Sequence, residues 1–219
     1  MFITASRLVA LGALASAIAA PAQAAFVHEH VTEFSTASNP NGVWEYRTAG
    51  DGVVNSASVL DAGLDTCCGG ANWNGNGDTF NLIGQNVMHP GDHSDAILTF
   101  VYPDAFAAPV AVHFDFGDLQ TPCGGNGARF TFSLNDTLVF TQLVPDSFSS
   151  DIVVNLLSAM APGDKFFIRL DRGPGTNNFC DGCSLVSAKF TSTTVPEPAS
   201  LGLLSLLGLP AVSLFRRRN

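Results

Sequence analysis

The strongest constraint on the fold is a series of short segments in which apolar and polar residues alternate. In residues 110–116, VAVHFDF, every second residue is a valine or a phenylalanine. The same period of two recurs in residues 128–134, 150–157, 164–171 and 185–192. Side chains of a β-strand share a face at this period, whereas a helix would need a period of 3.6. Each of these segments is therefore predicted to be a half-buried strand.

Clusters of turn-forming residues separate these segments, and Asn135-Asp136 between two of them predicts a tight hairpin. Many strands joined by such turns indicate an all-β fold, an antiparallel β-sandwich of roughly eight to ten strands. Fifteen phenylalanines lie between residues 25 and 194 and can fill the space between two sheets. Residues 25–194, about 170 residues, have the length of one domain.

The N-terminus has the features of a cleavable signal peptide. Arg7 precedes the apolar stretch Leu8–Ala20, and Ala22-Gln23-Ala24 fits the small-x-small pattern of signal peptidase. We expect cleavage after Ala24, so residues 1–24 form the leader. A buried N-terminal helix is the alternative interpretation.

The C-terminus combines three features in order. Pro196, Glu197 and Pro198 fix an extended backbone, because proline restricts both itself and the residue before it. Residues 199–215 follow without a charge and predict a short transmembrane helix of roughly 25 Å. Arg216, Arg217 and Arg218 then hold that end in the cytoplasm. The body, residues 25–194, is therefore expected outside the inner membrane.

This ending resembles the PEP-CTERM sorting signal, which occupies residues 195–219 here. The resemblance implies recognition by an exosortase, a membrane-embedded protease, in a Gram-negative bacterium that makes exopolysaccharide. It implies a membrane-anchored precursor, whose body is then released or attached in the cell envelope or outside the cell. A plain C-terminal anchor is the alternative.

The charge of the body narrows the classes of partner. Between residues 25 and 195 there are 18 acidic and 6 basic residues, a net charge of −12. Such a body repels phosphate, so no nucleic-acid partner is expected. Anionic polysaccharide is repelled in the same way, whereas neutral sugars or divalent cations suit this charge better.

All five cysteines lie in the body: Cys67, Cys68, Cys123, Cys180 and Cys183. An exported compartment permits disulfides, and an odd number leaves at least one cysteine outside an intrachain pair. We expect at least one long-range disulfide, such as Cys123 to Cys180 or Cys183. Cys180 and Cys183 also have the C-x-x-C spacing of redox and zinc sites, and both alternatives stay open.

One segment, CCGGANWNGNGD, carries the candidate ligand-binding residues. It is expected to be a loop in which Asn72, Asn74, Asn76 and Asp78 alternate with Trp73 and glycines. The Trp73 ring could stack on a sugar while the amides bind hydroxyl groups. Oxygens at every second position could instead bind calcium, although only one of them is a carboxylate. No other cofactor or metal is expected, and a solvated loop is the third interpretation.

A second resemblance covers most of the body. Asn39-Pro40-Asn41-Gly42-Val43-Trp44 looks like the N-P-N-G-x-W opening of many exported PEP-CTERM domains. The later turns, Met88-His89-Pro90-Gly91, Gly117-Asp118 and Pro162-Gly163-Asp164, follow in the order found there. The resemblance implies a jelly roll similar to galactose-binding-like carbohydrate modules.

These features predict a non-enzymatic, exported protein that binds or organises polysaccharide. No catalytic motif occurs in the sequence, and isolated acids such as Glu45, Asp115 and Asp118 do not form one. A polysaccharide hydrolase or lyase on the same jelly roll is the alternative. A matrix protein without a ligand is the third class.

Overall fold

The computed structural model describes residues 25–50, 57–65, 70–75, 78–105, 107–118, 127–145, 152–173 and 181–192. Side chains are not described for Val59, residues 61–65, Gly70, residues 78–79 and Asp118. All described residues belong to one compact unit, Ala24–Thr193. The predicted leader and sorting signal lie outside the described residues.

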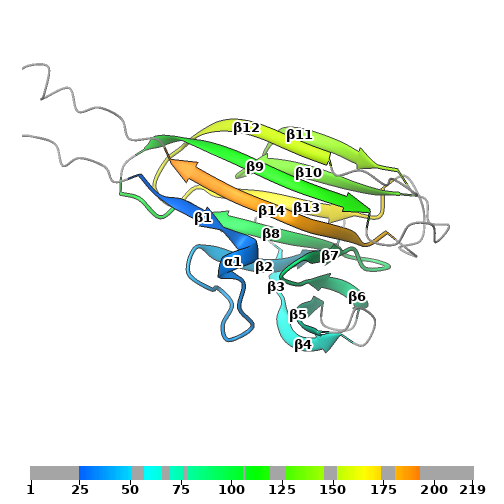
Figure 1. Cartoon of the computed structure of the whole chain (residues 1–219). Coiled ribbons are helices and arrows are strands. Elements are labelled where there is room, and N and C mark those ends of the chain that lie inside the picture. The colour runs from blue at the N-terminus through cyan, green and yellow to red at the C-terminus, as the bar shows by residue number, and fades with distance from the viewer. Residues whose placement is uncertain are drawn as a thin grey trace, which may run out of the picture. The chain divides into compact units, whose positions relative to one another are not determined.

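The chain folds into two antiparallel sheets that pack face to face (Figure 1). The large sheet has eight strands in the order β12-β9-β14-β7-β6-β5-β4, with β1 also paired to β14. Its strands are β1 Val27–Glu29, β4 Asp61–Asp65, β5 Gly70–Gly75, β6 Asp78–Ile83, β7 Val87–His89, β9 Ala108–Asp118, β12 Ile152–Met160 and β14 Cys183–Ser192.

The small sheet has six strands in the order β11-β10-β13-β8-β2-β3. Its strands are β2 Trp44–Ala49, β3 Ser58–Val59, β8 Asp95–Val101, β10 Ala128–Leu134, β11 Thr137–Val144 and β13 Lys165–Asp171. A single turn of helix, α1 His30–Glu33, links β1 to the loop before β2. From β8 to β14 the chain crosses repeatedly between the two sheets, as a jelly roll requires. The predicted antiparallel β-sandwich is confirmed.

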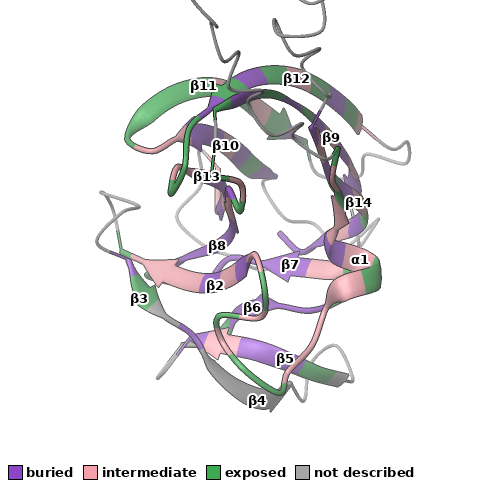
Figure 2. Cartoon of the chain, turned by 90° about the vertical axis from the view of Figure 1, so that its left-hand side faces the viewer, coloured by how far each residue is buried: buried purple, intermediate pink, exposed green. Residues whose placement is uncertain are grey.

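The core is built from the alternating residues that the sequence singles out. Along β9, Val110, Val112, Phe114 and Phe116 are buried, and the residues between them face outward. Phenylalanine rings from the two sheets meet in this interior, which is purple in Figure 2. The rings of Phe100 in the small sheet and Phe190 in the large sheet stack with centroids 4.0 Å apart. Burial of such large rings supplies the main driving force for closing the sandwich.

The predicted hairpin at Asn135-Asp136 is confirmed, with Asn135 at a φ of 51° between β10 and β11. The expected strand count is wrong, because the described residues contain fourteen strands. Seven of them, β1–β7, lie before residue 90 and are two to six residues long. Such short segments offer too few positions for a period of two to be recognised, and glycine and asparagine obscure several of them.

Candidate functional site

Asn72, Trp73 and Asn74, the centre of the predicted ligand-binding loop, lie at successive positions of strand β5. The expectation of a loop is therefore wrong for residues 70–75. Trp73 pairs with Ala62 and Ile83, and Asn74 pairs with Leu82 across the neighbouring strands. Since side chains of a strand alternate between the two faces of the sheet, Trp73 cannot share a face with Asn72 and Asn74.

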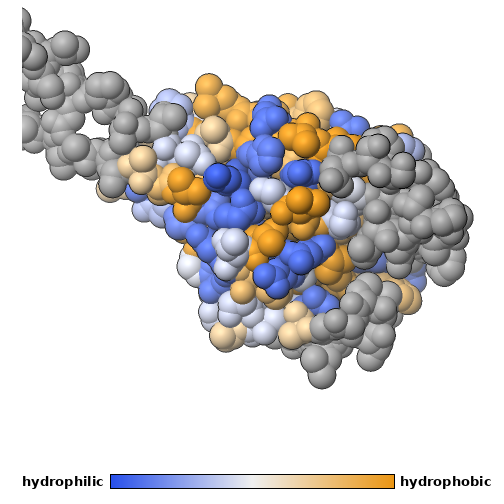
Figure 3. Space-filling view, in the orientation of Figure 1, coloured by the Kyte–Doolittle hydropathy of each residue, from blue (hydrophilic) through white to orange (hydrophobic). Residues whose placement is uncertain are grey.

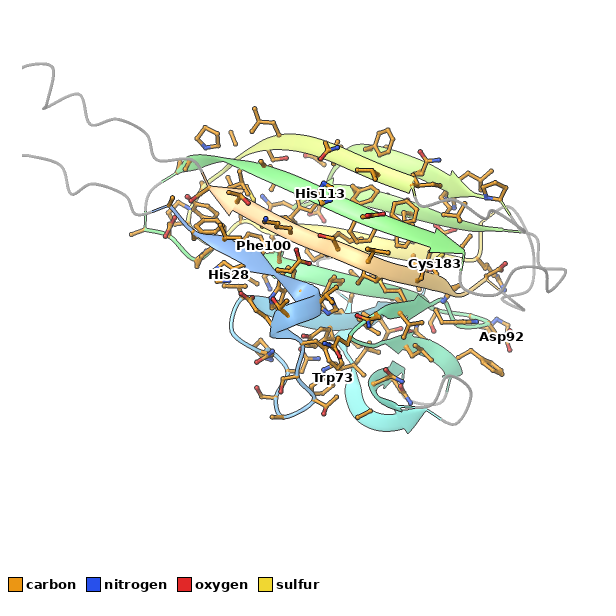
Figure 4. All side chains as sticks on the ribbon, in the orientation of Figure 1. His28, Trp73, Asp92, Phe100, His113 and Cys183 are labelled. Atoms are coloured by element: carbon orange, nitrogen blue, oxygen red, sulfur yellow. The ribbon has the colours of Figure 1, made fainter. Side chains whose placement is uncertain are left out.

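Trp73 points into the core and does not offer an open ring face, so its predicted role as a sugar platform is wrong. Its side chain is only 5% exposed, and its ring stacks on Tyr46 at a centroid distance of 5.4 Å and an angle of 10°. Its Nε1 donates to the carbonyl oxygen of Ser35 at 2.8 Å. The ring and its polar atom are both engaged in the fold. Figure 4 places Trp73 between β2 and β5.

Asn72 and Asn74 lie on the opposite face of β5. Asn72 is buried and packs against Gly84, where an added Cβ would lie 2.1 Å from its Oδ1. Asn74 is partly exposed, while its Oδ1 is enclosed and has no hydrogen-bond partner among the described residues. Asn76 lies outside the described residues, and for Asp78 only the backbone at the start of β6 is described. The calcium prediction for this segment stays a prediction.

The face that carries Asn74 also carries an exposed aromatic ring. Leu82 lies across from Asn74 on one side and from His89 on the other. The Phe80 ring, 38% exposed, lies 5.9 Å from the His89 ring. The His89 Nδ1 donates to the Pro90 carbonyl oxygen at 2.7 Å, which fixes the imidazole. We call this side of the sheet the aromatic–amide face and define it by residues Asn72, Asn74, Phe80, Leu82 and His89. Phe80 is exposed and Asn74 is partly exposed, whereas Asn72, Leu82 and His89 are buried beneath them.

Phe80 is the residue that sequence reasoning missed. Among the described Phe, Tyr and Trp side chains, Phe80 alone is classed as exposed. An exposed aromatic ring beside amide groups is a common arrangement for binding a sugar, because the ring contacts C–H groups while amides bind hydroxyls. A hairpin interpretation of residues 70–83, with its period of two, would have placed Phe80 and Asn74 together.

The N-P-N-G-x-W segment has a structural role in the described fold. The Glu33 carboxylate accepts from Trp44 Nε1 at 2.7 Å and contacts His28 Nδ1 at 3.1 Å. The Asn41 amide donates to the Glu33 carbonyl oxygen at 2.7 Å. Gly42 adopts a φ of 60°, the left-handed conformation that favours glycine, in the turn before β2. These contacts fasten the N-terminal strand and α1 over Trp44.

Asn39 extends this structural network to the edge of the small sheet. Its Oδ1 accepts from Tyr46 N at 3.0 Å, and its Nδ2 donates to the carbonyl oxygens of Tyr46 and Leu60 at 2.6 and 3.2 Å. The amide thus acts like a short piece of strand beside β2. Asn39 and Pro40 are joined by a cis peptide bond.

His30 lies inside an aromatic cluster. It is fully buried, and the rings of Phe34, Trp44 and Tyr46 surround it at centroid distances of 5.4–5.8 Å. Within the described chain, neither ring nitrogen has a hydrogen-bond partner. Burial lowers the pKa of His30 to about 3 and raises the pKa of Tyr46 to about 12. Both side chains are therefore neutral at pH 7 and belong to the core.

A second polar surface covers the outward face of the small sheet. We call it the ion-pair face; it gathers four of the six basic residues of the body, Arg47, Arg129, Lys165 and Arg169. Lys165 Nζ lies 2.9 Å from Glu45 Oε1, and Arg47 Nη2 lies 2.7 Å from Glu45 Oε2. Arg169 pairs with Asp95, and Arg129 Nε lies 3.0 Å from Asp171 Oδ2.

The charges of the ion-pair face satisfy one another. Glu45 is 13% exposed and bound by two cations, so it is not poised as a catalytic acid or base in this arrangement. Ile97, Thr99 and Phe167 between the pairs are completely buried. The aromatic–amide face has an exposed ring and an amide oxygen with no partner among the described residues, and it is the better candidate for ligand binding.

Metal binding finds no support among the described side chains. No group of three or more His, Cys, Asp or Glu residues in this part of the chain could hold an ion. Two of the described histidines contact polar side chains: His28 contacts Glu33, and His113 Nδ1 contacts Asn155 Oδ1 at 2.8 Å on the outer face of the large sheet.

Of the five cysteines, the structure describes Cys183, which is buried at the start of β14. Cys67, Cys68, Cys123 and Cys180 lie outside the described residues. Cys183 pairs in the sheet with Asp118, five residues before Cys123 in sequence. The predicted long-range disulfide, from Cys123 to Cys180 or Cys183, stays a prediction.

The sorting motif Pro196-Glu197-Pro198 and the arginines 216–218 also lie outside the described residues. Within the described part of the chain, no helix has the length and apolar character needed to cross a membrane.

No known family profile matches the sequence, and no curated protein matches it. Among solved structures, similar chains include CBM51 from Clostridium perfringens GH95, determined with methyl-galactose (14% identity, 78% of this chain and 94% of that chain, TM-score 0.36). Others are the C-terminal CBM6 of LamC from Zobellia galactanivorans (11%, 77% and 99%, TM-score 0.33) and a family 35 carbohydrate-binding module from Clostridium thermocellum (9%, 77% and 98%, TM-score 0.35). At these identities and TM-scores, the likeness is one of general architecture, and it leaves the ligand of this chain to be argued from its own residues.

Proposed function

We propose that this protein is an exported, non-enzymatic module that binds neutral polysaccharide through its aromatic–amide face. One observation carries the proposal: Phe80, the exposed aromatic ring of the described chain, lies on the same face as Asn74, whose Oδ1 has no hydrogen-bond partner among the described residues. A sugar lying on Phe80 could remove its C–H groups from water. The Asn74 oxygen is enclosed, so a sugar hydroxyl would have to displace its surroundings to reach it, and the new hydrogen bond would then offset most of the penalty for burying that oxygen.

The charge of the body favours an uncharged ligand. With 18 acidic and 6 basic residues between residues 25 and 195, a polysaccharide rich in carboxylates would be repelled. The four bases of the ion-pair face are already paired with carboxylates and offer little attraction for a further anion. Binding to a neutral glycan should therefore depend weakly on salt.

A glycan array with neutral and uronate-containing oligosaccharides tests this function. We expect the exported protein to bind one or more neutral glycans, and Phe80→Ala to lower the affinity about five- to thirtyfold, since losing a stacked ring is worth about 1–2 kcal/mol. Leu138→Ala is the matched control, because Leu138 is 62% exposed on β11 of the other sheet. Equal affinity of Phe80→Ala and the control would refute the proposed site, and no binding to any glycan would refute the function.

The proposal includes a route to the cell surface. The signal-peptide pattern at residues 1–24 and the Pro-Glu-Pro, apolar and arginine segments at 195–219 support export followed by exosortase sorting. Mass spectrometry of the protein recovered from its own host is expected to show an N-terminus at Ala25 and loss of the arginine-rich end. A full-length cytoplasmic product would contradict this route.

A further inference from the structure

At one side of the sandwich, each sheet ends in an edge strand, which pairs with a neighbouring strand on one side only. In the described part of the chain, β12 pairs only with β9, and β11 pairs only with β10. Both edges lie together at the top of the molecule in Figures 1 and 2. An edge strand presents a row of backbone N–H and C=O groups that another strand can bind.

Strand β12 lacks the usual protection of such an edge. Its sequence, IVVNLLSAM, contains no charged residue and no proline. Its pairing with β9 runs from Ile152 to Met160 without a register shift, so no bulge bends the edge away. The opposite edge of the same sheet, β4, contrasts with it, because two of its five residues are Asp61 and Asp65. Natural proteins commonly use such charges to prevent unwanted strand pairing.

The side chains along β12 are mostly apolar on both sides of the sheet, apart from the exposed Asn155, which contacts His113, and the buried Ser158. Val153 and Leu157 face outward and are 50% and 72% exposed. Ile152 and Leu156 face inward and are only partly buried against the core. In Figure 3, apolar residues interspersed with hydrophilic ones lie along the upper margin of the molecule, where Figure 1 places β12. Another strand placed against this edge would cover both rows.

We propose that β12 is a dimerisation edge, at which two copies of the chain pair their β12 strands antiparallel and join the large sheets. A second copy is the occupant we choose because β12 carries no charge and can lie antiparallel to its own copy without opposing like charges. The net charge of −12 on each body opposes association and should keep the dimer weak.

The sequence of β12 is also compatible with a twofold axis at Leu156. In that register Val153 lies across from Ala159, Val154 from Ser158, and Leu156 from its own copy. No like charges then face each other, and the contact is self-complementary as a twofold interface requires. A single pair of strands buries a small area, so the dimer should be weak and should depend on protein concentration.

Sedimentation equilibrium of the full chain in a mild non-ionic detergent, over a wide range of concentrations, tests the dimer. We expect the apparent mass to rise from one chain to two with increasing concentration. Leu157→Lys should raise the dissociation constant about tenfold or more, because the twofold axis brings two added charges close together. Ala159→Lys, on the same outward row, should act in the same direction.

Val186→Lys is the matched control. Val186 is 49% exposed on β14, an inner strand of the same sheet, so this lysine should leave the dissociation constant unchanged. Thermal unfolding of each variant shows whether the fold is intact. A chain that stays monomeric at all concentrations would overturn the proposal. So would equal effects of Leu157→Lys and Val186→Lys, or a dimer that only Leu143→Lys on the β11 edge weakens.

Discussion

The two faces of strand β5 differ in how completely their polar atoms are satisfied. On the core side, Trp73 stacks on Tyr46 and its Nε1 is bound by the Ser35 carbonyl. On the opposite side, Asn74 Oδ1 has no hydrogen-bond partner among the described residues, and the exposed ring of Phe80 lies on the same face. The difference teaches that a tryptophan between asparagines can be a core residue, while the next strand supplies the exposed aromatic ring that we propose as the sugar contact.

The largest expected effect is on the free energy of unfolding when the aromatic ring on each face is removed. Trp73→Ala removes a buried ring and its hydrogen bond, and it should lower the free energy of unfolding by about 3–5 kcal/mol. Phe80→Ala removes a ring that is already 38% exposed and should cost less than about 1.5 kcal/mol. Urea unfolding of both variants measures this contrast. Comparable losses would mean that Phe80 belongs to the core.

The pH dependence of stability sharpens the description of the core side. In the folded protein, burial lowers the pKa of His30 from 6.5 to about 3. Between pH 6.5 and pH 3, His30 therefore takes up a proton in the unfolded chain but stays neutral in the folded protein. Protonation of His30 therefore leaves the free energy of unfolding unchanged above pH 6.5 and lowers it progressively as the pH falls toward 3. By pH 4 the loss should be about 3 kcal/mol.

His30→Phe isolates that contribution, because it keeps an aromatic ring among Phe34, Trp44 and Tyr46 but cannot take up a proton. Urea unfolding at pH 7 and pH 4 should show a smaller acid loss in the variant than in the original chain. Parallel pH profiles for the two proteins would refute the assignment of a buried, neutral imidazole.

The N-terminal network should contribute a smaller amount. Asn39→Ala leaves the Tyr46 N–H without its side-chain acceptor, and it should lower the free energy of unfolding by about 1–3 kcal/mol. Ser38→Ala, at an exposed neighbouring position, is the control and should have almost no effect. An equal, negligible loss in both variants would show that Asn39 is not part of the β2 edge.

The smallest effect is expected on the outward side of β5. Asn74→Ala removes an enclosed oxygen that has no partner within the described part of the chain, so the free energy of unfolding should change by less than about 1 kcal/mol and can increase. The same variant should weaken glycan binding. Thermal unfolding and the glycan array together measure the two effects. A large loss of stability would show that the Asn74 oxygen is satisfied within the fold.

The sequence predicts the main strands of the sandwich because they are long enough to repeat their pattern. β9 and β14 contain eleven and ten residues, and four or more alternating positions identify the core face. Short strands such as β5 and β6 offer three positions on each side. Glycine and asparagine in these strands also satisfy the usual criteria for a loop, which is why residues 70–75 are misassigned.

The candidate site was accessible to sequence reasoning only in part. Asn72 and Asn74 could be selected by their amides, and the structure places both on one face. Selecting Phe80 required recognising residues 70–83 as a hairpin, because only the pairing of β5 with β6 places Phe80 on the same face as Asn74. The role of Glu33 as the partner of Trp44 and His28 likewise depends on long-range packing.

The most direct test of the account is to locate the bound glycan on the protein. An amide NMR spectrum of the isotope-labelled, exported protein, titrated with the neutral oligosaccharide selected by the array, reports the affected residues. We predict that the largest shifts fall in residues 72–75 and 80–90, with little change in the ion-pair face around Lys165 and Arg169. Shifts confined to the ion-pair face, or to the outer face around His113, would contradict the aromatic–amide face as the binding surface.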